Sequence, residues 1–172
     1  MVDANFERKE RRMLVMRNFV FGVEDSLVST VGLLSGIAAV GIPQGTVILT
    51  GVVLVFVEAF SMAVGTSLAE HSAEEYAGFG HDGRIRRGSL LAGSIMFVSY
   101  FVSGFIPLAP YLVWEDGTAL VVSVAASLAA LFALGAVSAR ASHVPMGREA
   151  FRMLLIGGAA VGVGVLVGTL VH

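Results

Sequence analysis

The chain has 172 residues, of which 56% are hydrophobic and 14% are charged, and its mean hydropathy is +0.84. This composition supplies more apolar surface than a soluble domain of this size can bury, so it indicates an integral membrane protein. The net charge of −2 includes no basic excess, which argues against nucleic-acid binding. The absence of cysteine excludes disulfides, thiolate metal sites and cysteine nucleophiles.

Residues 1–17 are polar and lack the apolar core of a cleavable signal peptide, so we expect a cytoplasmic N-terminal arm. Residues 18–172 are expected to form one transmembrane domain. Five apolar segments within it are each long enough to cross about 30 Å of hydrocarbon as a helix. The expected spans are 19–40, 47–69, 90–113, 119–139 and 153–171. The predicted fold is therefore an all-α integral membrane protein with five transmembrane helices.

The basic residues predict the orientation, because lysine and arginine are retained on the cytoplasmic side during insertion. All 11 lie before the first span, after the second or after the fourth. The opposite links, 41–46 and 114–118, contain none. We therefore expect a multi-pass protein with a cytoplasmic N-terminus and a C-terminus on the other side, in the plasma membrane if the source is prokaryotic.

Small residues recur four positions apart in the first and fifth spans, a spacing that lets helix backbones approach closely. The pairs are Gly32 and Gly36, Gly158 and Gly162, and Gly164 and Gly168. Either they pack helices within one copy of the chain or they pack two copies against each other.

Acidic residues inside the spans are the strongest functional signal, because a carboxylate near the bilayer centre costs at least ~2.5 kcal/mol on insertion scales. In the first span, one narrow helical stripe contains Asn18, Gly22, Asp25, Ser29, Gly32 and Gly36. Asp25 on this stripe either lines an ion path or is a buried hydrogen-bond partner that orders the bundle. Glu24 points about 100° away from Asp25 and carries less weight.

The second span carries a matching stripe of Glu58, Met62, Gly65 and Ala69. Counted from the cytoplasmic ends of the spans, Asp25 and Met62 lie about 10 Å deep and Glu58 about 16 Å deep. Carboxylate oxygens together with a thioether favour a transition-metal ion over Mg²⁺ or Ca²⁺. Met62 could instead be a packing residue, and Glu58 could be a metal ligand, a proton carrier or a structural residue.

Polar residues follow the second span at Glu70, His71, Glu74 and Glu75. Glu70 with Glu74, and His71 with Glu75, are i, i+4 pairs whose side chains can converge on a helix. They form either a solvated helix end or a site that collects metal ions at the cytoplasmic mouth.

Five ordered motifs resemble the vacuolar iron transporter family. Residues 18–32, NFVFGVEDSLVSTVG, resemble its first-helix signature, and SMAVG at 61–65 resembles its second-helix motif. PLAP at 107–110, LGAVSAR at 134–140 and the glycine-rich fifth span fit the family as well. The resemblance runs from about Asn18 to the C-terminus.

This resemblance implies a homodimer with an ion path at its interface, lined by Asp25 and Met62. It also implies that Fe²⁺ or Mn²⁺ leaves the cytoplasm in exchange for protons. The chain departs from the family at Thr66, where a glutamate is common, and at Glu58, where small residues are common. The link after the second span is also short, as in members that lack a cytoplasmic metal-binding domain.

The sequence as a whole predicts a dimeric transition-metal transporter with no tightly bound cofactor, whose partners are divalent ions, the lipid bilayer and a second copy. We do not expect an enzyme, because no HExxH zinc motif and no nucleophile elbow occur. The alternative is a non-transporting membrane anchor or assembly partner of an iron-handling protein, in which the acids only fix helix packing.

Overall fold

Five helices make up the computed structural model, which describes residues 4–76, 83–114, 117–142 and 144–171. The helices are α1 (Ala4–Ala39), α2 (Gln44–Tyr76), α3 (Gly83–Val113), α4 (Thr118–Ser142) and α5 (Met146–Val171). Each is long and apolar enough to cross a membrane, and no strand occurs within the described residues. The predicted all-α fold with five spans is confirmed.

The helices extend beyond the predicted spans, most of all in α1 and α2. α1 already begins at Ala4, so the polar arm is helical from that residue, and α2 continues to Tyr76. The added residues are rich in Glu, Arg, Lys and Ala, which have high helix propensity in water. The predicted bounds marked where the apolar stretches end, whereas the helices end where helix-forming residues run out.

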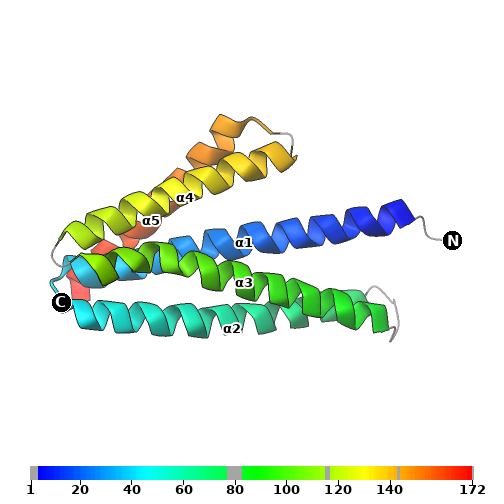
Figure 1. Cartoon of the computed structure of the whole chain (residues 1–172), viewed down its shortest axis with the longest axis horizontal. Helices are drawn as coiled ribbons and strands as arrows, with labels where there is room; N and C mark the ends of the chain where they lie inside the picture. Colours follow the sequence, from blue (N-terminus) through cyan, green and yellow to red (C-terminus); the bar gives the residue numbers. More distant parts are fainter. Residues whose placement is uncertain (1–3, 77–82, 115–116, 143, 172) are drawn as a thin grey trace.

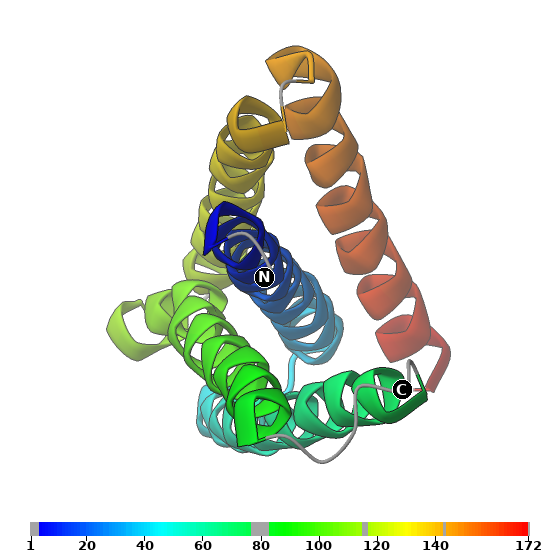
Figure 2. The same ribbon diagram turned by 90° about the vertical axis from the view of Figure 1, so that its right-hand side faces the viewer.

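The first helix lies at the centre of the fold, with α2 and α3 on one side and α4 and α5 on the other (Figure 2). It contacts all four other helices. The start of α1 lies at the same end as the α2–α3 and α4–α5 connections, and the C-terminus lies at the opposite end (Figure 1). The segments that carry the basic residues therefore share one end, and the cytoplasmic position of that end stays a prediction.

The turn between α1 and α2 depends on two residues with special backbone properties. Gly41 has a positive φ of 76°, which residues with a Cβ rarely adopt. Pro43 directly precedes α2 and cannot continue α1. The Gln44 side chain then donates hydrogen bonds to the carbonyl oxygens of Tyr111 and Trp114, at 3.0 Å for the latter. These bonds fix the start of α2 against the end of α3.

Glycines allow α1 and α5 to touch backbone to backbone. A Cβ on Gly36 would lie 2.5 Å from the carbonyl oxygen of Gly164, and one on Gly164 would overlap the carbonyl oxygen of Gly32. By contrast, a Cβ on Gly158 or Gly162 would meet no atom within 4 Å. Two of the three predicted glycine pairs therefore pack within one copy, and the pair Gly158 and Gly162 stays open.

Buried hydroxyl groups bond mainly to backbone carbonyls, as expected where the surrounding lipid offers no hydrogen-bond partner. Ser26 of α1 donates to the Tyr100 carbonyl of α3 at 2.7 Å. Ser123 of α4 donates to the Pro107 carbonyl of α3 at 2.6 Å. These bonds join the central helix and α4 to α3.

We expect Gly164→Ala to destabilise the fold by about 1–3 kcal/mol, because the new methyl group collides with the α1 backbone. Thermal unfolding in detergent would measure the loss. Gly158→Ala is the matched control on the same helix. Its added methyl group meets open space, so its stability should equal or exceed that of the parent chain. Equal stability of both variants would contradict the described α1–α5 crossing.

Candidate functional site

Asp25 of α1 and Glu58 of α2 lie at the same level, near the middle of the membrane-spanning region. Asp25 is midway along the apolar span Arg11–Ala39, and Glu58 is midway along Gln44–Ala73. Both carboxyl groups are half-buried, and they lie within electrostatic range of each other. The longer span of α1 places Asp25 deeper than the count from the sequence did. The structure therefore brings together the two acids to which the sequence gave most weight.

Neither carboxylate has a partner among the described residues. No hydrogen bond or ion pair joins the side chain of Asp25 or Glu58 to any part of the chain that the structure describes. A carboxylate that only orders a bundle is expected to accept hydrogen bonds, because an unpaired charge in a low-dielectric region is costly. These two acids are therefore poorly explained as packing residues.

Tyr100 of α3 lies near both acids of the pair. Its side chain is fully buried, and its hydroxyl lies 2.8 Å from Oγ of Ser29, one helical turn beyond Asp25. Tyr100 is within electrostatic range of both Asp25 and Glu58. Our sequence interpretation missed Tyr100. The available signal was a tyrosine inside an apolar helix, whose hydroxyl needs a polar partner when buried.

Met62 lies one turn beyond Glu58 on α2 and is also half-buried. Farther along the predicted stripe, Gly65 and Ala69 are exposed, and a Cβ on Gly65 would meet nothing within 4 Å. Ser61 beside Met62 is exposed as well. Around and beyond Met62, α2 is therefore exposed at the surface of the chain, on the side toward the N-terminal end of α1. We call this surface, which includes Ser61, Gly65 and Ala69, the open α2 face.

One copy of the chain supplies an incomplete set of metal ligands at this level. The described residues contain no cluster of three or more histidine, aspartate or glutamate side chains. Asp25, Glu58 and Met62 together offer two carboxylates and one thioether. Transition metals usually take four to six ligands, so a metal ion bound here would need further ligands from water or from another chain.

Glu24 lies near two groups of charges. On the α5 side it is within electrostatic range of Arg152 and Glu149, and Arg152 Nη1 is 3.5 Å from Glu149 Oε2. Glu24 is also within electrostatic range of Asp25, its neighbour in the chain. The lower weight of Glu24 stays a prediction.

The polar end of α2 divides into two parts. Glu70 forms an ion pair with Arg17 of α1. This pair connects the two helices between the level of the acid pair and the N-terminal end of α1. His71 and Glu75 remain exposed, with Nε2 of the histidine 3.4 Å from Oε1 of the glutamate. The side chain of Glu74 lies outside the described residues. Sequence periodicity indicated the His71–Glu75 pair but missed the pairing between Arg17 and Glu70.

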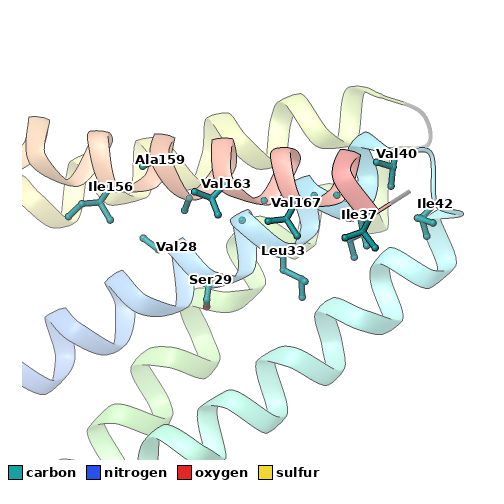
Figure 3. A pocket seen from close by; sticks show the side chains of 16 residues that line it. Val28, Ser29, Leu33, Ile37, Val40, Ile42, Ile156, Ala159, Val163 and Val167 are labelled. Atoms are coloured by element: carbon teal, nitrogen blue, oxygen red, sulfur yellow. The ribbon is translucent and has the colours of Figure 1, made fainter.

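A groove of about 900 Å³ opens beside Ser29 and runs between α1 and α5 toward the C-terminal end (Figure 3). Every residue that lines it except Ser29 is apolar or glycine, including Leu33, Ile37, Val163 and Val167. Such a surface offers no ligand for a cation. The candidate ion site is therefore confined to the α1–α2 side.

Comparison with known proteins identifies the family of the chain. No curated protein matches the chain by sequence. The model of the VIT family matches residues 16–79 and 77–169, which together include Asp25, Glu58, Met62 and all or most of each of the five spans. The chain is a multi-pass integral membrane protein, and it belongs to the vacuolar iron transporter (VIT) family of membrane metal-ion transporters.

Proposed function

We propose that the protein moves Fe²⁺ or Mn²⁺ out of the cytoplasm in exchange for protons, through a path completed by a second copy of the chain. The observation that supports this most directly is the pair of unpartnered carboxylates at mid-membrane, Asp25 and Glu58. A membrane protein retains such groups at a cost in insertion free energy, and ion pathways are their usual use.

The ligand chemistry favours a transition metal. Asp25 and Glu58 supply hard oxygen ligands, and Met62 adds a polarizable sulfur one turn away from Glu58. Mg²⁺ and Ca²⁺ make little use of thioethers, whereas later divalent metals accept mixed oxygen, nitrogen and sulfur sets. Both Fe²⁺ and Mn²⁺ accept carboxylate ligands, and we infer these two ions from the family, because the thioether alone does not single them out.

A second copy would complete the site. A two-fold axis beside the open α2 face would double the available acids and thioethers and would enclose the path between the two copies. Four helices are arranged around α1, and the interior among the described residues is filled by apolar side chains and by buried hydroxyls, many of which bond to backbone carbonyls.

The dimer can be tested by mass and by cross-linking. In native lipid, the mass should be twice the 17.9 kDa of one chain. Because the chain has no cysteine, Ser61→Cys on the open α2 face introduces a single thiol, and its oxidation should give a covalent dimer. Phe132→Cys, an exposed position on α4, is the matched control and should remain uncross-linked. A monomeric mass with no Ser61→Cys cross-linking would contradict the interface path.

The roles of the two acids can be separated in proteoliposomes. We expect Asp25→Asn to lower metal flux roughly 10-fold to 100-fold, because it removes a ligand while keeping the side-chain volume. Glu58→Gln removes titration as well as charge. If Glu58 carries the proton, this variant keeps downhill metal movement but loses its response to a pH gradient. If Glu58 is mainly a ligand, metal movement itself collapses.

Glu24→Gln is the matched control for both variants. Glu24 is a half-buried acid on the same helix that lies near Arg152, Glu149 and Asp25. Because it points about 100° away from Asp25 on the helix, its substitution should leave flux and pH response unchanged. Wild-type behaviour of Glu58→Gln in both assays would make Glu58 a structural residue.

The polar end of α2 should affect metal capture more than conduction. Replacing Glu70, His71, Glu74 and Glu75 with Ala should weaken apparent metal affinity about tenfold, because a local negative field concentrates cations at the mouth. Maximal flux should stay similar. The control Asp3→Ala/Glu7→Ala/Glu10→Ala removes an equal number of negative charges from the N-terminal arm. It should leave the apparent metal affinity unchanged. Lost flux at saturating metal, in a folded variant, would contradict this division of roles.

A further inference from the structure

A second cavity lies between the N-terminal half of α1 and the last turns of α4, and its inner end reaches Glu24. Its volume is about 1180 Å³. Figure 1 shows why it exists, because the hairpin of α4 and α5 diverges from α1 toward the end where α1 begins. The α4 side of the cavity is formed by Ser138 and Ala141, and the remaining lining residues belong to α1. The cavity is thus a wedge at one membrane surface.

The outer part of this wedge is lined by three basic side chains that are free of ion pairs with the described residues. Lys9, Arg11 and Arg12 line it, and none of them forms an ion pair with a described residue. Arg17 also lines the wedge, but its charge is already paired with Glu70. Three adjacent cations therefore face a cavity at the point where the apolar span of α1 begins, at Arg11.

The inner part of the wedge is apolar and open. Met13 and Phe21 line it with 56% and 49% of their surfaces exposed, and Val20 lies between them in depth. The single acid of the lining, Glu24, is 15 residues beyond Lys9, which corresponds to about 22 Å along the helix. A negatively charged ligand group bound beside Lys9 would therefore lie far from the carboxylate of Glu24 at the inner end of the cavity.

We propose that this wedge binds one anionic phospholipid, with its phosphate on Lys9, Arg11 and Arg12 and an acyl chain along Phe21. Cations above an exposed apolar wall match the two parts of such a lipid, and basic pockets between transmembrane helices are known to hold anionic headgroups. A soluble phosphate compound would use the cations but would leave the apolar wall exposed. The bound lipid fills the space that separates α1 from the α4–α5 hairpin. This inference does not depend on the proposed transport cycle.

Native mass spectrometry of the full chain can test the proposal, with phosphatidylglycerol titrated against phosphatidylcholine of the same acyl chains. Phosphatidylglycerol should be retained as a single bound molecule and phosphatidylcholine should not. Lys9→Gln/Arg11→Gln/Arg12→Gln should weaken retention about 100-fold, because each basic side chain near an anionic group contributes roughly a fivefold gain in binding. Phe21→Ala should also weaken retention, although it changes no charge.

The matched control is Arg84→Gln/Arg86→Gln/Arg87→Gln, which removes three positive charges from the start of α3 at the same membrane surface. It should retain phosphatidylglycerol like the parent chain. Equal loss in this control would overturn the proposal in favour of a diffuse surface charge. Displacement of the lipid by millimolar inorganic phosphate or glycerol phosphate would overturn it in favour of a soluble ligand. Equal retention of the two lipids would exclude an anionic site.

Discussion

The surrounding lipid offers no hydrogen-bond partner, and this constraint explains most of the polar contacts in the bundle. Ser26 and Ser123 bond to carbonyls of α3, Tyr100 pairs with Ser29, and Arg17 pairs with Glu70 at the membrane edge. Against this background, two carboxylates at mid-membrane have no partner among the described residues. Thr30, Ser35 and Tyr111 also have buried hydroxyls without a hydrogen-bond partner among these residues, but an unpaired carboxylate is costlier than an unpaired hydroxyl. This cost supports the proposal that Asp25 and Glu58 serve a ligand.

The central position of α1 connects the structural and the functional parts of the molecule. Toward the C-terminal end of α1, Gly32 and Gly36 pack against the backbone of α5 so closely that no side chain fits between the two helices. Nearer the middle of α1, Ser26 and Ser29 form hydrogen bonds with Tyr100 of α3. Asp25 directly precedes Ser26 and lies one turn before Ser29, on the N-terminal side of the glycine contacts. Its position is therefore set by contacts that do not involve its own carboxylate, which leaves the carboxylate available to an ion.

The sequence predicted the helices and the acids well, because hydropathy and helical periodicity are local properties. It predicted the five spans, the neighbouring levels of Asp25 and Glu58 inside them, and the His71–Glu75 pair, while the roles of the two acids stay predictions. It did not predict that the stripe from Asn18 to Gly36 divides, with Gly22 against Ser99 of α3 and Gly36 against Gly164 of α5. That division, like the Tyr100 and Arg17 pairings, depends on how helices cross. Crossing geometry is set by contacts between distant parts of the chain, which periodicity within one helix does not contain.

The acid pair also offers a physical reason why metal and proton movement would be linked. Two like charges in a low-dielectric region repel each other, and the repulsion is weakened only by screening from water or by bound cations. A divalent metal neutralises both charges at once, and two protons do the same. In the proposed exchange, metal and protons would compete for one pair of carboxylates, and mutual repulsion would disfavour the empty, doubly charged state. A site that avoids its empty state releases one cation mainly when the other replaces it, and such a preference for replacement is what exchange across a membrane requires.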